Sequence, residues 1–502
     1  MLVLKTITEL RCHLEKEREK KIALVPTMGA LHAGHLSLIE RAMSENDLVV
    51  VSIFVNPLQF APTEDLEKYP RQLTEDCNLC EKYGVDVVFA PSFEEMKTSE
   101  EQTTTVIPPK TMTEVLCGKF RPLFFPGVAT IVTKLLNIVQ PTTAYFGQKD
   151  AQQLAIIRRL VTDLNIPVHI KGCPIVRENS GLALSSRNQY LTPTEKEQAT
   201  VLSRSLFKAL RAFLQGENKA DKLREIVEQE LGKVPEIQLQ YVEFVHPLTM
   251  IPLTEITDKG LLAIACFLGS TRLIDNIILR QPIIAIDGPA GAGKSTVTRR
   301  VAQELGLIYL DTGAMYRAVT WLVMQSGISV DDEQAISTLI NEAKIELTPT
   351  QVKINEQDVT TAIRSPEVTA NVSKIAAQSA VRTKLVKLQQ NYGEKGGIVA
   401  EGRDIGTNVF PDAEVKIFLT ATVKERARRR LQDLKNQGHS AVDLQQLEKD
   451  IAHRDYLDST RQISPLQKAA DAVEIITDGM TIEEVKNQII SLYQQKSFFL
   501  RH

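Results

Sequence analysis

Strand-like and helix-like patterns of apolar residues alternate through the first part of the chain. Short apolar runs stand at residues 22–25, 48–54 and 85–89, and further strands are expected at 144–147 and after residue 167. Amphipathic helical patterns lie between them, after residue 35, after residue 127 and at 151–164. Such alternation is typical of a parallel sheet covered by helices. We therefore predict an α/β domain over residues 1–190.

The pattern changes near residue 192. Two charged amphipathic helices are expected from there, followed by strands at 237–245 and 261–267, which indicates a small α+β domain over residues 191–278. A second α/β pattern begins with the apolar run at 283–287. We place the domain junction at residues 280–282 and a third domain at 282–502, with a linker too short to be a flexible tether.

Composition and charge indicate a globular protein with more than one domain and argue against several other classes of protein. The 502 residues are too many for one hydrophobic core, and a formal net charge of −3 argues against a protein that coats nucleic acid. No apolar run approaches the roughly 20 residues of a membrane-spanning helix, and residues 1–21 lack the apolar centre of a signal peptide. We expect a cytoplasmic protein that binds neither membrane nor nucleic acid.

The six cysteines are scattered over both halves, which suits reduced thiols better than a disulfide framework. Cys77 and Cys80 form a C-x-x-C pair. No second pair and no histidine stands near them in the sequence, so we do not expect a metal or redox site there.

The first candidate site is an H-x-G-H motif at residues 32–35, where a predicted strand turns into a helix. A helix N-terminus offers free N–H groups, and two imidazoles add donors for the charge on a transferring phosphate. Gly34 would let a phosphate approach closely. The alternative is that the motif is only a helix cap.

Two further motifs decide between these explanations. G-Q-K-D at 147–150 ends a later strand, and L-S-S-R-N at 184–188 follows another. The carboxyl ends of parallel strands share one edge of the sheet, where doubly wound folds bind ligands. Lys149 and Arg187 can clamp a triphosphate there, and Asp150 can accept hydrogen bonds from ribose hydroxyls. Each alone would pass for a surface charge, but their shared edge argues for a site.

Together with V-N-P-L-Q-F at 55–60, these motifs resemble the pantothenate synthetase family, over about residues 1–275. The family is similar in fold to class I aminoacyl-tRNA synthetases, so the resemblance implies a Rossmann-like domain. It also implies a two-step ligation. Pantoate attacks the α-phosphate of ATP to give pantoyl adenylate and pyrophosphate, and β-alanine then displaces AMP. A homodimer through this half is a further family-based expectation.

The resemblance also assigns residues. His32, His35, Lys149 and Arg187 would be catalytic, with His35 the candidate proton donor. Neutral amides can hold a hydroxy-carboxylate without cancelling the charge that its attack requires, and Gln59, Gln153, Asn56 and Arg121 would hold pantoate and β-alanine. The ATP-binding residues would be Met28, Gly29, Ala30, Leu31, His32, Ala33, Gly34, His35, Gly147, Gln148, Lys149, Asp150, Val176, Leu184, Ser185, Ser186 and Arg187.

Two positions depart from the family's usual pattern. Cys117 and Phe124 stand where a glutamate and a histidine are usual, while Gly118, Arg121 and Gly127 remain. The departure affects one wall of the expected site and none of the phosphate ligands, so we still expect activity.

The second candidate site is G-x-x-x-x-G-K-S at 288–295, between a strand and a helix. In a P-loop of this kind, backbone N–H groups cradle phosphates, Lys294 reaches the β and γ oxygens, and the Ser295 hydroxyl binds Mg²⁺. Mg²⁺ with ATP is the cofactor we expect, without a prosthetic group.

Further motifs at 309–317, 401–407 and 454–466 resemble bacterial cytidylate kinase over about residues 282–502. This resemblance implies phosphorylation of CMP and dCMP by ATP. The arginines in these motifs suit the binding of a dianionic phosphate. For any single arginine, the alternative is an ion pair on the protein surface. The CMP site would contain Thr312, Arg317, Ser373, Arg382, Arg403, Arg454, Asp458 and Arg461. The ATP site would contain Gly288, Gly291, Gly293, Lys294, Ser295, Thr296, Arg426 and Arg430.

In that family an insertion closes over the monophosphate, here at about residues 326–382, with Ser373 and Arg382 at its base-contacting positions. The basic run at 424–430 is interpreted as part of a lid at about 424–440 that folds onto ATP, rather than as a nucleic-acid patch. Asp458 is our candidate for selecting cytosine, because a carboxylate accepts a hydrogen bond from the N4 amino group of that base. The alternative is an ion pair with Arg454 and Arg461 along one helical face.

The leading interpretation is therefore two enzymes in one chain. One alternative keeps both folds but changes the carboxylate and monophosphate substrates. Another makes the second half a nucleotide-sensing module without turnover, against which the intact Lys294 and Ser295 argue.

Overall fold

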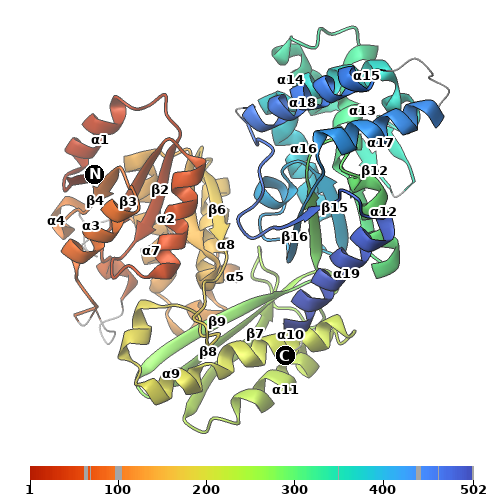
Figure 1. Cartoon of the computed structure of the whole chain (residues 1–502). Coiled ribbons are helices and arrows are strands. Elements are labelled where there is room, and N and C mark those ends of the chain that lie inside the picture. The colour runs from red at the N-terminus through yellow and green to blue at the C-terminus, as the bar shows by residue number, and fades with distance from the viewer. Residues whose placement is uncertain are drawn as a thin grey trace. The chain divides into compact units, whose positions relative to one another are not determined.

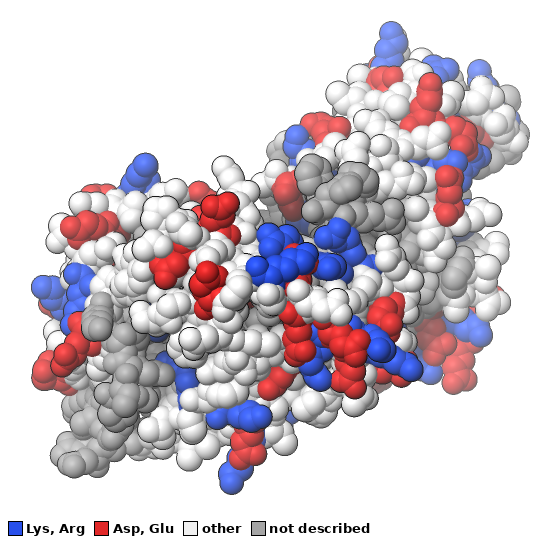
Figure 2. Space-filling model, turned by 90° about the horizontal axis from the view of Figure 1, so that it is seen from below, with Lys and Arg blue, Asp and Glu red and all other residues white. Residues whose placement is uncertain are grey.

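The computed structural model describes residues 1–60, 66–67, 69–96, 104–348, 350–436, 443–461 and 463–499. The chain divides into two compact units, Met1–Leu279 and Arg280–His502 (Figure 1). Each unit has hydrophobic clusters of its own. Among the described residues, no helix combines the length and the apolar character needed to cross a membrane. On the face shown in Figure 2, acidic and basic side chains are interspersed.

A six-stranded parallel sheet forms the centre of the first unit, which confirms the α/β prediction. Its strand order is β1 (Leu2–Leu4), β4 (Val87–Phe89), β3 (Leu48–Ile53), β2 (Ile22–Thr27), β5 (Thr143–Gly147) and β6 (His169–Cys173). The order reverses between β2 and β5. In doubly wound folds the ligand binds at that point, outside the carboxyl ends of the strands.

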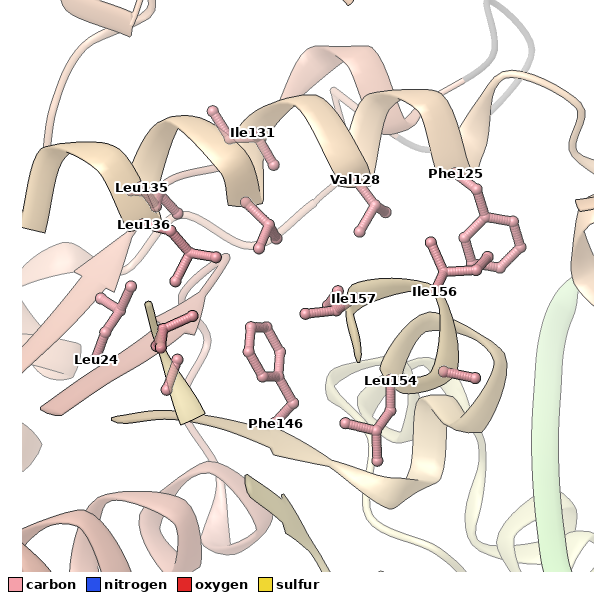
Figure 3. Packing of buried hydrophobic residues seen from close by; sticks show 14 of the residues in the cluster. Leu24, Phe125, Val128, Ile131, Leu135, Leu136, Phe146, Leu154, Ile156 and Ile157 are labelled. Carbon is pink, nitrogen blue, oxygen red and sulfur yellow. The ribbon is translucent and has the colours of Figure 1, made fainter. Parts of the chain in front are cut away.

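Helices cover both faces of this sheet, because successive residues of each strand point to opposite sides. Leu24 of β2 faces a cluster that includes α1 (Ile7–Glu15), α7 (Phe124–Val139) and α8 (Ala151–Asp163), whereas Val25 faces α2 (Ala33–Glu45) and α3 (Leu73–Lys82). Figure 3 shows the first of these clusters. Its labelled residues are Leu24, Phe125, Val128, Ile131, Leu135, Leu136, Phe146, Leu154, Ile156 and Ile157.

Two helices begin earlier than the sequence predicted. α2 begins at Ala33 because His32 caps it, so His35 lies in the first turn instead of before the helix. α7 begins at Phe124, before Gly127. The first difference places Gly34 and His35 inside the first turn of α2.

The end of the first unit holds three helices and three strands, where two of each were expected. The helices are α9 (Pro193–Ala199), α10 (Val201–Leu214) and α11 (Ala220–Leu231), and an antiparallel sheet joins β7 (Ile237–Val245), β8 (Gly260–Leu268) and β9 (Thr271–Leu279). The single residue Thr200 separates α9 from α10. β9 was missed because the polar residues Arg272, Asp275 and Asn276 interrupt its apolar pattern.

The second unit contains a five-stranded parallel sheet. Its order is β11 (Ile308–Asp311), β15 (Ile398–Gly402), β10 (Ile283–Asp287), β16 (Val415–Thr420) and β17 (Val473–Ile476). Helices α12 (Lys294–Leu305) and α19 (Ile482–Phe499) cover one face, and α13 (Thr312–Gln325) and α16 (Ser379–Tyr392) cover the other. The P-loop follows the central strand β10.

The predicted insertion contains α14 (Glu333–Glu342), the small sheet β12 (Ile345–Leu347), β13 (Val352–Ile354) and β14 (Gln357–Asp358), α15 (Pro366–Ala377) and the start of α16. The basic run lies on α17 (Val423–Asn436), followed by α18 (Leu444–Thr460). Residues 437–440 of the predicted lid lie outside the described residues.

The junction between the units is short and anchored. β9 ends at Leu279, and the guanidinium of Arg280 donates to Glu414 Oε1 at 3.0 Å and to the Asp412 carbonyl at 3.0 Å. The Gln281 carbonyl accepts from Gly397 N at 3.2 Å, and β10 begins at Ile283.

Candidate active sites

The loop between β2 and α2 is held by a carboxylate that the sequence analysis missed. The backbone amides of Ala30 and Leu31 donate to the two oxygens of Asp76 at 2.9 and 2.8 Å, and Asp76 is only 1% exposed. Gly29 and Ala30 take positive φ angles of 81° and 53°. These two amides are therefore used inside the protein, and the loop presents its histidines in a fixed position.

His32 and His35 are both hydrogen-bond acceptors at Nδ1. His32 Nδ1 accepts from Gly34 N at 3.1 Å, and His35 Nδ1 accepts from His32 N at 3.4 Å. Burial lowers the pKa of His35 to about 3 and that of His32 to about 4, helped by the neighbouring Lys149. Both rings are therefore neutral at pH 7 and carry their proton on Nε2.

Gly34 leaves room for the His32 ring rather than only for a phosphate. A Cβ at this position would lie 2.8 Å from His32 Cε1 and 3.0 Å from its Nδ1. The two imidazole rings are tilted by 36° relative to each other, with centroids 4.1 Å apart. The motif is thus a helix cap and also a paired set of N–H donors.

A cavity of about 810 Å³ opens beside these rings. The residues that line it include most of the predicted ligase site: Met28, His32, Gly34, His35, Asn56, Gln59, Arg121, Gly147, Lys149, Asp150, Gln153, Val176, Leu184, Ser185, Ser186 and Arg187. Gly29, Ala30, Leu31, Ala33 and Gln148 belong to the same loops but are not among the described lining residues. The structure thus brings the separate motifs of the first half to one cavity.

Asn56 builds the turn that presents Gln59. Its Oδ1 accepts from Leu58 N at 3.2 Å, and its Nδ2 donates to the Gly127 carbonyl at 3.1 Å. A Cβ on Gly127 would lie 2.1 Å from the Leu58 carbonyl oxygen, so only glycine lets α7 pack against this turn. Arg121 Nη2 donates to the Gln59 carbonyl at 3.0 Å, which ties the turn from the other side.

In the second unit, the P-loop closes tightly on its own lysine. Lys294 Nζ donates to the Gly288 and Pro289 carbonyls, both at 2.7 Å. Gly288 has φ 146°, and a Cβ there would lie 1.9 Å from the Leu419 carbonyl oxygen. Gly291 and Gly293 take φ angles of 78° and 87°, in the left-handed region.

Glu401 accompanies the P-loop serine and was not singled out from the sequence. Ser295 Oγ donates to Glu401 Oε2 at 2.9 Å, and Tyr309 OH also donates to this carboxylate. Burial, followed by the charge of Asp311, raises the pKa of Glu401. Thr312 Oγ1 donates to the backbone carbonyl of Glu401 at 2.7 Å, so Thr312 supports the same strand end.

Four arginines of the predicted CMP site have buried nitrogens without hydrogen-bond partners among the described residues. They are Nε of Arg317, Arg382 and Arg454, and Nη2 of Arg461. Burial lowers the pKa of Arg454 and Arg461, with Arg403 and Arg382 as the neighbouring charges. Unsatisfied buried donors are costly, so this cluster suits an anion with several oxygens and differs from a set of surface ion pairs.

Asp458 is paired differently from the expectation. Its Oδ2 accepts from Arg403 Nε at 3.0 Å, and Arg403 Nη1 donates to the Gly288 carbonyl at 2.9 Å. The alternative explanation named an ion pair with Arg454 and Arg461, whereas the carboxylate pairs with Arg403. The contact of Asp458 with cytosine stays a prediction. Arg461 lies just past the end of α18, where its Nε donates to the Ser464 carbonyl at 2.6 Å.

A second acidic residue, Asp404, lies beside the predicted base contact. Arg382 Nη2 pairs with Asp404 Oδ2 in the interior, and Asn408 Nδ2 donates to the same oxygen at 3.2 Å. The Arg382 guanidinium also lies 5.5 Å from the centre of the Tyr316 ring. Ser373 is half-buried on α15. Asp404 belongs to the motif at residues 401–407, but nothing in the spacing of that motif singled out this carboxylate over Asp458.

Comparisons with known proteins identify the family of each half. Residues 2–278 match the family Pantoate-beta-alanine ligase, and residues 284–495 match the family Cytidylate kinase. A "Bifunctional pantoate ligase/cytidylate kinase" of Trichormus variabilis is 61% identical and is aligned over 99% of both chains. The chain belongs to this bifunctional family. The resemblance drawn from the motifs of each half is confirmed.

The bifunctional relative of Synechocystis sp. is 60% identical over 98% of this chain and 99% of its own. A pantothenate synthetase structure from Thermus thermophilus is 45% identical, with a TM-score of 0.53, and covers 55% of this chain and 99% of that chain. We refer below to Met1–Leu279 as the ligase unit and to Arg280–His502 as the kinase unit.

In the ligase unit, the two departures from the family pattern fill the cavity wall with neutral and aromatic groups. Cys117 Sγ lies 3.2 Å from Tyr241 OH and accepts from Arg272 Nη2 at 3.3 Å. Phe124 stacks under the guanidinium of Arg121, 3.9 Å from the ring centre. Both residues therefore have partners that fix the wall.

In the kinase unit, Arg426 is already committed to protein partners. It is 3% exposed, donates to the Ala290 carbonyl at 3.0 Å and forms a two-pronged pair with Asp455 of α18. Its guanidinium therefore joins the P-loop, α17 and α18, and its contact with ATP stays a prediction. Arg430 is exposed on the same helix, and Thr296 is exposed on α12.

The six cysteines have free thiols. Over the part of the chain that the structure describes, no group of three or more His, Cys, Asp or Glu side chains is arranged to hold a metal ion.

Proposed function

We propose that the ligase unit condenses pantoate and β-alanine with ATP, releasing AMP and pyrophosphate, and that the kinase unit phosphorylates CMP and dCMP with ATP. The ligase proposal is carried by one cavity that brings the neutral Nε2–H donors of His32 and His35 together with Lys149 and Arg187. The kinase proposal is carried by the buried arginine nitrogens described above, which have no hydrogen-bond partner among the described residues, in a unit that also contains a P-loop.

In the ligase unit, a pantoate carboxylate oxygen attacks the α-phosphorus of ATP and the bond to pyrophosphate breaks. Lys149 and the two imidazole N–H groups stabilise the negative charge that builds on the phosphate. Gln59 and Gln153 hold pantoate without neutralising the attacking carboxylate. The amine of β-alanine then attacks the acyl carbon of the adenylate, AMP leaves, and the amine loses its proton to water. His35 contributes as a neutral hydrogen-bond donor rather than as a charged acid.

In the kinase unit, a CMP phosphate oxygen attacks the γ-phosphorus of ATP, and ADP leaves. The arginine cluster binds the acceptor phosphate. Mg²⁺ bound to the ATP phosphates would neutralise part of their charge. Ser295 fits its role as the protein ligand, because Glu401 accepts the hydroxyl proton at 2.9 Å and leaves the oxygen lone pairs free.

The adenylate step makes a direct prediction. Pantoate and ATP without β-alanine should support exchange of labelled pyrophosphate into ATP, because forming the adenylate is reversible. The exchange is measured with and without pantoate, and omission of pantoate is the control. Net pantothenate synthesis without any exchange would refute a freely reversible adenylate, and release of ADP with phosphate would refute adenylation altogether.

The choice of nucleotide base by the kinase unit leads to another prediction. If Asp458 accepts a hydrogen bond from the cytosine amino group, Asp458→Ala should lower kcat/KM for CMP by an amount that corresponds to about 2–3 kcal/mol of transition-state stabilisation. The kcat/KM for UMP should fall much less. The CMP/UMP preference would then shrink by about 10- to 100-fold.

The matched variant is Asp404→Asn, because Asp404 contacts Arg382 whereas Asp458 contacts Arg403. An unchanged CMP/UMP ratio in Asp458→Ala, together with a reduced ratio in Asp404→Asn, would move base recognition to Asp404. Assays with other monophosphates and other hydroxy acids test the remaining alternative substrates.

A homodimer through the ligase unit and a cytoplasmic location stay predictions. Sedimentation of the purified chain checks the first, and cell fractionation checks the second.

A further inference from the structure

We infer that two adjacent residues of β9, Asp275 and Asn276, are positioning residues for ATP in the ligase unit. Each of them fastens one of the three loops that carry predicted ATP ligands: Asn276 the loop at 147–150, and Asp275 the loop at 176–187. The inference rests on the proposed ligase function, since it concerns the nucleotide of that reaction. Neither residue belongs to the motifs by which the site was recognised.

Asn276 holds the loop that carries Lys149. Its Nδ2 donates to the Lys149 carbonyl at 2.8 Å and to the Gln148 carbonyl at 3.2 Å, and the residue is only 7% exposed. One amide group therefore uses its donors on two successive carbonyls of the turn after β5. Because those carbonyls are fixed, the Lys149 side chain starts from a fixed backbone position.

Asp275 holds the other loop. Its carboxylate is 3% exposed and pairs with both outer nitrogens of Arg177, at 2.6 and 2.9 Å. Arg177 Nη1 also donates to the Gly181 carbonyl at 3.1 Å, and Leu184 N donates to the Val176 carbonyl at 3.0 Å. The loop between Val176 and Leu184 is thus closed on itself and tied to β9 through one buried ion pair.

The arrangement follows from the geometry of a strand. Successive side chains point to opposite sides, so two neighbouring residues can serve two different loops. β9 is also an edge strand of its sheet. The polar interruptions in β9 are therefore explained by what they hold, and the placing of ATP depends on the small sheet that follows α11.

A purely structural role predicts different results from a positioning role. Asn276→Asp keeps the size of the side chain but replaces the Nδ2 donor with an oxygen that repels the two carbonyls. Asn276→Ala removes the donor without adding a repulsive group. We expect the ligase KM for ATP to rise about 10-fold or more in Asn276→Asp and about 2- to 10-fold in Asn276→Ala, the range of one lost hydrogen bond. The KM for pantoate should stay within about 2-fold of the wild type.

Asn218→Asp and Asn218→Ala are the matched controls. Asn218 lies in the same part of the ligase unit and donates to Glu255 at 2.6 Å, away from both loops. Thermal unfolding of the full-length chain, followed by circular dichroism, reports whether the ligase unit of each variant is folded, because CMP phosphorylation depends on the other compact unit. Asp275→Asn replaces one oxygen of the Arg177 pair and should also raise the KM for ATP selectively, so it decides the question if the Asn276 variants do not fold.

Equal rises in the KM for ATP and for pantoate would overturn the inference, as would a larger effect of alanine than of aspartate at position 276. Wild-type chain that forms no pantothenate would instead overturn the proposed function. The two failures are therefore distinguishable.

Discussion

Replacing Lys149 with alanine is expected to lower pantothenate formation about 100- to 1000-fold, while CMP phosphorylation by the same chain stays unchanged. A charge contact made in the transition state contributes about 3–4 kcal/mol. The Lys149 ammonium lies close enough to His32 and His35 to lower the pKa of both rings, and it lines the same cavity. The measurement is kcat/KM for pantothenate formation, with kinase turnover as the internal reference.

The control for this variant is Lys208→Ala, which removes an exposed ammonium of the ligase unit from the buried carboxylate of Glu230, a group that Arg204 and Lys233 also hold. We expect both activities of the control to equal those of the wild type. If Lys149→Ala lost both activities while its fold remained intact, the model of two separate sites would be wrong.

Replacing Lys294 with alanine is expected to have the reverse effect, lowering CMP phosphorylation about 100- to 1000-fold and sparing the ligase. The variant loses the ammonium group that contacts the β and γ phosphates of ATP. It also leaves the Gly288 and Pro289 carbonyls without the ammonium that now bonds them at 2.7 Å. A coupled assay of ADP formation with CMP measures the effect.

Lys384→Ala serves as its control, because this half-buried lysine of α16 donates to the Asn341 carbonyl at 3.0 Å and is not part of the predicted sites. Undiminished turnover in Lys294→Ala would place phosphoryl transfer outside the P-loop. Wild-type chain that binds ATP but forms no ADP with CMP would favour the nucleotide-sensing alternative.

The sequence was informative where a pattern is local. Apolar periodicity found the parallel strands, and the loops after β2 and β10 were recognised because phosphate-binding turns need fixed spacings of glycine, lysine and histidine. Asp76 and Glu401 could not be found in this way, because their partners come from distant parts of the chain. A lone carboxylate on a predicted helix or strand has no spacing that marks it.

Two contacts in the kinase unit could not be predicted from the sequence for a related reason. The spacing of Asp458 from Arg454 and Arg461 places them near one helical face, but its carboxylate pairs with Arg403, which follows β15. Arg426 belongs to a basic run that predicted a lid, yet its guanidinium bonds Asp455 and the P-loop backbone. In both cases, packing between elements decided a contact that helical periodicity alone could not.

The anchored junction has a consequence for proteolysis. A protease needs several residues of exposed, locally unfolded chain before it can cut. Between the end of β9 at Leu279 and the start of β10 at Ile283, Arg280 is bonded to Glu414 and Gln281 to Gly397. Trypsin should therefore leave the bond after Arg280 intact under native conditions, although an arginine stands there. The cell would then degrade or retain the two enzymes together, and their molar ratio would stay at one throughout the life of the chain.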